Sequence, residues 1–292
     1  MNSHAQVPTA VVLSDRIRVY FASRPRPDLS LTTYVDLDLR RPERILGLAE
    51  QPVLELGDPG TFDEHGIMPS AAVKDGDLVR LYYSGWCRLD GRAPYHNTTG
   101  VAVSNDDGRT FRRLAMGPVL DRTPDEPFSA TSPAVVRVGD TWHAYYSCGL
   151  GWIEQEGKLE HIYELRHATS FDGIQWRRVG EVAVGQAYPE EAITRPTLLR
   201  RGETEWWMWF CCRGSRSFRD GTDGYRIGFA VSSDLEHWQR DDRRAGIDPS
   251  VEGWDSQMLA YPCVVDAPAG RLMFYNGNDF GRGGFGYAVW EE

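Results

Sequence analysis

The segment with the clearest chemical potential is Phe62–Pro69, which reads Phe-Asp-Glu-His-Gly-Ile-Met-Pro. It places two carboxylates and an imidazole directly ahead of a short apolar run. Acidic residues recur at similar distances before later apolar runs, at Glu126, Glu190, Glu191 and Asp255. Carboxyl groups crowded at one site acquire different pKa values, so that one can act as an acid and another as a base. Glycoside hydrolysis is the reaction that most directly needs such a pair.

The elements that must position these acids form a repeat. Each apolar run starts with a proline, and these prolines lie 61 to 66 residues apart, at Pro8, Pro69, Pro133, Pro196 and Pro262. About a dozen residues after each proline comes an aromatic-rich run, and turn residues between the two runs indicate hairpins. Repeats of this length with four short strands are typical of propeller blades. The sequence predicts an all-β fold, with residues 1–292 forming a single five-bladed β-propeller of four-stranded antiparallel blades around a central tunnel. A two-sheet sandwich is the alternative, but it does not explain the period.

Several segments refine this expectation. The Ser-x-Asp patterns at residues 104–106, 170–172 and 232–234 are interpreted as scaffold turns. Residues 154–164 are interpreted as a long hairpin loop, and the glycine-rich residues 281–286 as a blade turn and not a phosphate loop. The last repeat ends in a third strand, residues 286–290. We therefore expect N-terminal residues to complete the last sheet and close the ring.

Composition excludes some functions. The net charge of −10 argues against nucleic-acid binding, and no apolar run approaches the roughly 20 residues that span a membrane. The first residues have neither the basic region nor the apolar core of a signal peptide. The five cysteines lack C-x-x-C spacing and are expected to be reduced thiols of a cytoplasmic protein. No metal or other cofactor is expected. The 10 Trp and 13 Tyr residues suit a carbohydrate partner, since flat apolar rings stack on sugars.

In a propeller, the beginnings of the innermost strands meet at one end of the tunnel. We therefore expect Asp63, Glu191 and Asp255 to form the catalytic carboxylate set, with Asp63 as base and Glu191 as acid. The residues expected to contact substrate are Glu64, His65, Trp86, Glu190, Arg195, Arg213, Trp254, Tyr261, Asn276 and Asn278. Each has a structural alternative, since Asp often caps turns, Arg neutralises buried acids and Trp packs in cores. Glu126, in a proline-flanked loop, is expected to be solvated.

With five blades and these segments, the chain resembles the five-bladed propeller glycosidase superfamily. That group includes arabinanases, invertases, levansucrases, glycoside hydrolase family 43 and the mannoside phosphorylases of family 130. Segments 192–196, 224–228 and 274–278 resemble those of a branch found with bacterial glycan or secondary-metabolite genes. The resemblance implies a glycosidase that hydrolyses a small or activated glycoside. Invertases and family 43 enzymes carry their base as an Asp on the first inner strand, whereas this chain has no acid around Pro8 and could substitute Asp63.

Two alternatives to hydrolysis remain open. The first is phosphorolysis or glycosyl transfer, for which Arg195, Arg213 and His65 could supply a basic cluster; dependence on inorganic phosphate would identify it. The second is a propeller that binds sugar without catalysis, or one recruited to a biosynthetic pathway.

Overall fold

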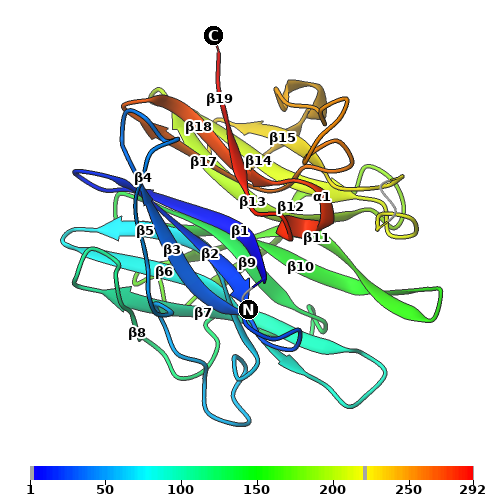
Figure 1. Cartoon of the computed structure of the whole chain (residues 1–292). Coiled ribbons are helices and arrows are strands. Elements are labelled where there is room, and N and C mark those ends of the chain that lie inside the picture. The colour runs from blue at the N-terminus through cyan, green and yellow to red at the C-terminus, as the bar shows by residue number, and fades with distance from the viewer. Residues whose placement is uncertain (1–2, 220–221, 292) are drawn as a thin grey trace.

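The computed structural model describes residues 3–219 and 222–291, and the strands follow one another along the chain as five blades. The blades are arranged around a common centre (Figure 1). Blade 1 contains β1 (Ser3–Val12), β2 (Ile17–Arg24), β3 (Leu31–Leu37) and β4 (Ile45–Leu48). Blade 2 contains β5 (Gly66–Asp75), β6 (Leu78–Arg88), β7 (Tyr95–Ser104) and β8 (Arg112–Arg113). Blade 3 contains β9 (Ala130–Val138), β10 (Thr141–Gln155), β11 (Lys158–Ser170) and β12 (Arg177–Val184). Blade 4 contains β13 (Ala192–Arg201), β14 (Glu205–Arg213), β15 (Arg226–Ser232) and β16 (Gln239–Arg240). Blade 5 contains β17 (Ala260–Ala267), β18 (Gly270–Asn276) and β19 (Gly286–Val289), with the short turn α1 (Asn278–Gly281) before β19.

The predicted five-bladed propeller is confirmed. Within each blade, consecutive strands pair antiparallel, and one parallel bridge, Thr98 to Ala130, joins blades 2 and 3. The aromatic-rich second strands are the centre of each blade, and Tyr82, Tyr83, Tyr145 and Trp209 are fully buried there. Aromatic side chains suit these positions because they cover the apolar faces on which adjacent blades pack.

The expected closure of the ring by an N-terminal strand in the last sheet is wrong. In the described residues, blade 5 has three strands, and β1 pairs with β2 as the inner strand of blade 1. Closure comes from side chains instead. The buried Asn276 amide accepts from the backbone of Val7 and donates to the carbonyls of Ala5 and Gly284. Apolar residues of blades 1 and 5, among them Val19 and Phe274, form one shared cluster.

Each inner strand has a register irregularity near its proline. A proline cannot donate to the neighbouring strand, and a bulge accommodates the missing hydrogen bond. In four blades the preceding residue has a left-handed backbone, with φ between 51° and 59°, at Val7, Ser132, Arg195 and Tyr261. The prolines lie two to five residues inside the strands and are not the first residues of them.

The smaller sequence predictions have mixed outcomes. The Ser-x-Asp patterns are capped turns, as expected. Asp106, Asp172 and Asp234 each accept hydrogen bonds from a serine hydroxyl and from the backbone amides that follow. The glycine-rich segment leads into β19, as predicted. The predicted loop at residues 154–164 is instead the end of the long β10–β11 hairpin, whose turn lies at Glu156 and Gly157 (Figure 1). All five cysteines are free thiols. Among the described residues, no helix has the length and hydropathy needed to cross a membrane.

We predict that Asn276→Ala destabilises the propeller by roughly 1–3 kcal/mol, because buried partners lose their hydrogen bonds. Urea unfolding followed by tryptophan fluorescence measures the change. The matched control is Asn105→Ala, since Asn105 is exposed in a turn and should leave the unfolding midpoint unchanged. Equal midpoints for the two variants would contradict the proposed closure.

Candidate functional site

A central pocket of about 570 Å³ lies where the five inner strands begin. Every blade contributes to it: Gln6 and Val7 from β1, Met68 from β5, Ser132 from β9, Thr194 from β13 and Tyr261 from β17. The bulged residues of the inner strands are therefore at the pocket, as the propeller geometry predicted for one end of the tunnel.

The walls of the central pocket combine rings with charged groups. The aromatic residues are Trp86, Tyr95, Tyr163, Phe218, Tyr225, Tyr261 and Phe280. Of the described residues that line it, Glu160 and Asp279 are the carboxylates. Glu160, at the end of the β10–β11 hairpin, is 8% exposed and accepts from Arg219 at both oxygens, at 2.9 and 3.1 Å. Asp279 lies in α1 with φ of 57° and is exposed.

Two arginines of the central pocket have neutral partners. Arg213 is 5% exposed, and its guanidinium donates to the Tyr225 hydroxyl, to Ser215 and to backbone carbonyls. It also stacks on Phe218, 3.7 Å from the ring centre. Burial opposes the charged form of Arg213, but the neighbouring Tyr225 leaves its pKa raised. Arg24 donates through Nε to Gln6 at 2.9 Å.

Arg195 lies at the hub, next to Thr194 of the pocket, and is 2% exposed. Its guanidinium donates to the carbonyl of Ser70 in blade 2, and to Val7, Pro8 and Thr9 in blade 1. Burial lowers its pKa to about 10. Its Nε has no partner in the described part of the chain. Arg195 thus ties three inner strands together. Of the residues expected to contact substrate, Trp86, Arg213 and Tyr261 line the pocket.

The three predicted catalytic acids do not line this pocket. Asp63 (1% exposed) accepts from Tyr83 of β6 at 2.9 Å and from Arg113 of β8 at 2.8 and 3.0 Å. Glu191 (1% exposed) accepts from both terminal nitrogens of Arg240 in β16, at 2.7 and 2.9 Å.

Asp255 and Glu126 have the same kind of partner. Asp255 accepts from Tyr275 at 2.8 Å, and Glu126 from Tyr146 at 2.8 Å, with Arg178 paired to its other oxygen. Glu126 is 3% exposed, so the expectation that it is solvated is wrong. The physical reason is the proline offset. Because the prolines lie inside the inner strands, these acids precede the strands, and each contacts the second strand, the outer strand or both strands of its own blade. The expected gathering of Asp63, Glu191 and Asp255 at the tunnel mouth is corrected accordingly.

The other predicted contact residues also lie outside the lining of the central pocket. Glu190 is on the surface in a bidentate pair with Arg216. His65 stacks behind Trp86, with ring centres 6.0 Å apart and Glu64 beside it. Trp254 stacks on Tyr275 at 5.1 Å. Asn276 closes the ring, and Asn278 accepts from the backbone amides of Gln257 and Met258.

Sequence reasoning missed Glu160, Asp279, Arg24 and Arg219. Their positions do not follow the blade period, since they come from a hairpin end, a turn, the end of β2 and the loop that follows β14. The sequence does carry a signal of the structural role of the acids. Asp63, Glu126 and Asp255 each precede a second-strand tyrosine by 20 residues, which indicates a repeated structural contact.

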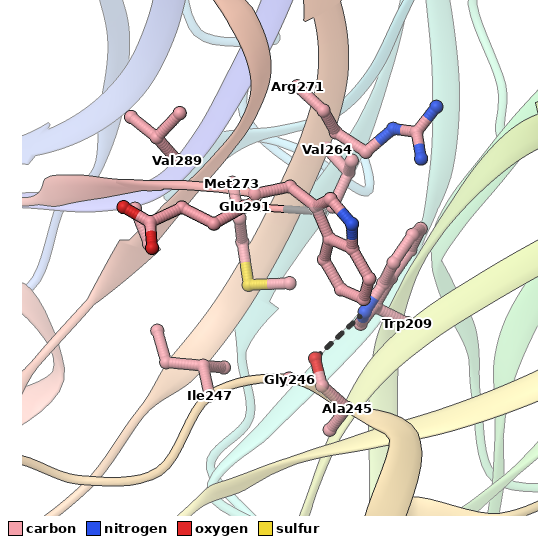
Figure 2. Close-up of a pocket in the computed structure, with 11 residues that line it drawn as sticks. Trp209, Ala245, Gly246, Ile247, Val264, Arg271, Met273, Val289 and Glu291 are labelled. Carbon is pink, nitrogen blue, oxygen red and sulfur yellow. Dashed lines mark hydrogen bonds between the residues drawn. The ribbon is translucent and has the colours of Figure 1, made fainter.

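A second cleft, of about 350 Å³, lies between blades 4 and 5 (Figure 2). It is lined by Trp209, Ile247, Val264, Met273 and other residues, and Trp209 donates to the carbonyl of Ala245 at 3.1 Å. It is less suited to sugar chemistry, because the arginine in it, Arg271, pairs with Asp266. Within residues 3–219 and 222–291, no cluster of His, Cys, Asp and Glu side chains is arranged to hold a metal ion.

The fold is that of the five-bladed propeller glycosidases of families 43 and 32. A BT0996 RGII complex matches with a TM-score of 0.74 at 16% identity, covering 98% of this chain and 86% of that protein. A thermostable family-43 glycoside hydrolase matches with a TM-score of 0.70 at 14% identity, over 100% and 91%. The GH32 β-fructofuranosidase BmSUC1 of Bombyx mori matches with a TM-score of 0.61 at 15% identity, over 94% and 56%.

Sequence similarity defines the family more narrowly. The chain is 36% identical over 292 residues to the uncharacterized protein MT1551 of Mycobacterium tuberculosis strain CDC 1551, covering 99% of this chain and 93% of the relative. The uncharacterized protein Rv1502 of strain H37Rv matches to the same extent. The chain therefore belongs to the family of these mycobacterial proteins. No family model matches it.

We predict that Arg113→Met costs about 3–5 kcal/mol of stability, because it leaves the Asp63 carboxylate buried without its cationic partner. Arg112→Met is the matched control, since the adjacent Arg112 is exposed on the same strand. Chemical denaturation of both variants makes the comparison. A brace at Asp63 would be refuted by equal stability of the two.

His161 supports a pH prediction. It is 2% exposed and stacks on Trp152 with ring centres 4.0 Å apart, and neither ring nitrogen has a partner in the described part of the chain. Burial, and then nearby Arg213, lower its pKa to about 3.

The unfolded chain therefore binds a proton at His161 below pH 6.5, and the folded chain does so only near pH 3. Above pH 6.5, His161 does not lower the free energy of unfolding. As the pH drops from 6.5 to about 3, protonation of the unfolded chain at His161 lowers the free energy of unfolding progressively. We expect His161→Phe, which keeps a flat ring, to make the free energy of unfolding less dependent on pH in this window. Denaturant titrations from about pH 7 to about pH 4 test it, and identical slopes for variant and wild type would contradict it.

Proposed function

We propose that the chain binds a glycoside in the central pocket and hydrolyses it. The observation that carries this proposal is the combination, in one pocket of a glycosidase fold, of seven aromatic residues with the carboxylates Glu160 and Asp279. Aromatic faces stack on sugar rings. Two carboxyl groups supply the acid and the base or nucleophile that glycoside cleavage needs.

The surroundings of the two carboxylates suggest their roles. Arg219 fixes the orientation of Glu160 through two hydrogen bonds, which suits the group that activates water or attacks the anomeric carbon. Asp279 is exposed, so it can exchange its proton with solvent, as the acid must do in each cycle. Proton donation to the leaving oxygen is therefore assigned to Asp279.

The second candidate is sugar binding without catalysis. It is favoured by a specific observation: the acids before the inner strands of blades 2, 3, 4 and 5 hold their own blades together. The bulged residues that line the pocket, Val7, Ser132 and Tyr261, are not acidic.

We predict that Glu160→Gln and Asp279→Asn each lower kcat by about 10²–10⁴-fold on a glycoside that the wild-type protein cleaves. Sugar release followed by NMR measures turnover directly, without added phosphate. Glu154→Gln is the control, because Glu154 is exposed on the neighbouring strand. Full turnover in both pocket variants would refute the assignment. Binding of glycosides by the wild-type protein without any cleavage would establish the second candidate instead.

A further inference from the structure

The charge of the central pocket differs from the charge of the whole protein. The chain carries a net charge of −10, yet three guanidinium groups, Arg24, Arg195 and Arg213, lie in or beside the pocket without a carboxylate partner among the described residues. The fourth arginine, Arg219, is neutralised by Glu160. The remaining pocket carboxylate is Asp279, so positive charge is in excess.

Burial makes this excess significant. Arg195 and Arg213 are 2% and 5% exposed, and a buried charge without an opposite charge is costly. Their neutral partners, carbonyls and hydroxyls, satisfy hydrogen bonds but do not cancel the charge. An anionic group that enters the pocket would cancel the charge.

Arg24 is the group best placed to contact such an anion. Its Nε is held by Gln6, which orients the side chain. Its two terminal nitrogens have no hydrogen-bond or ion-pair partner in the described part of the chain, and the residue lines the pocket. A planar fork with free N–H groups matches the paired oxygens of a carboxylate or a phosphate.

We propose that the sugar recognised by the central pocket carries an anionic substituent, a uronate carboxylate or a phosphate ester, which Arg24 binds. This inference rests on the proposed function for the location of the sugar, and it adds the chemical class of the ligand. The aromatic rings then contact the ring faces of the sugar while the arginines contact its charge.

Calorimetric titration with matched sugars tests the proposal. Glucose, galactose and mannose are each compared with the corresponding uronic acid and 6-phosphate, and inorganic phosphate is titrated alone. We expect at least one anionic sugar to bind about tenfold or more tightly than its neutral counterpart. The uronate and phosphate series identify which anion is recognised.

Arg24→Gln should weaken binding of that anionic sugar about tenfold and weaken binding of the neutral counterpart by a clearly smaller factor. Arg177→Gln is the control, since it removes the same charge from an exposed outer strand and should change neither affinity.

The outcomes separate the two proposals. Equal affinity for neutral and anionic sugars overturns the anionic class and leaves sugar binding in place. So does equal weakening of both by Arg24→Gln. Inorganic phosphate that binds as tightly as every sugar phosphate also overturns it, because the sugar then contributes nothing. If no sugar binds at all, both proposals fail.

Discussion

The positive charge of Arg195 at the hub is the constraint that the rest of the structure must satisfy. Its guanidinium reaches from blade 4 to backbone carbonyls of blades 1 and 2, so it links three of the five inner strands at the hub. The left-handed backbone at Arg195 and its counterparts is strained for residues with a side chain, at about 1–3 kcal/mol each. Such strain persists where the surrounding contacts require it, and the hub supplies those contacts.

The acids of the blades illustrate how a repeat can imitate a catalytic site. Asp63, Glu126 and Asp255 each meet a tyrosine 20 residues later, and Asp63, Glu126 and Glu191 each pair with an arginine of an outer strand. A buried carboxylate needs such partners in every blade. Acids that recur with the blade period therefore indicate structural contacts within the blades and not a catalytic site. Groups that break the period, such as Glu160 and Arg219, are found in the central pocket.

The sequence predicted the fold well because the fold depends on features that recur. Proline-led runs, aromatic second strands and Ser-x-Asp turns occur in successive blades, and each is local. The candidate site was predicted less well, because it depends on offsets of a few residues. The prolines lie inside the inner strands, which moves Asp63 and Asp255 out of the tunnel but keeps Tyr261 in it. Long-range contacts account for the remaining differences. Glu160 reaches the pocket because the β10–β11 hairpin extends as paired strands to Gln155 and Lys158. A polar segment of that length is equally compatible with a loop, so its sequence alone did not predict the paired strands.

The negative net charge of the chain and the positive charge of the buried arginines act over different distances. An acidic chain can therefore hold an anionic ligand. At physiological ionic strength the Debye length is about 8 Å, and exposed charges farther apart are largely screened. The repulsion of an anion by the net charge of −10 is therefore weakened at the mouth of the pocket. Arg195 and Arg213 are buried, and the lower dielectric around them leaves their attraction for a bound anion stronger than in water. In the proposed complex the surface sets how readily the ligand approaches, while Arg24 holds the anion and the buried arginines add to its attraction.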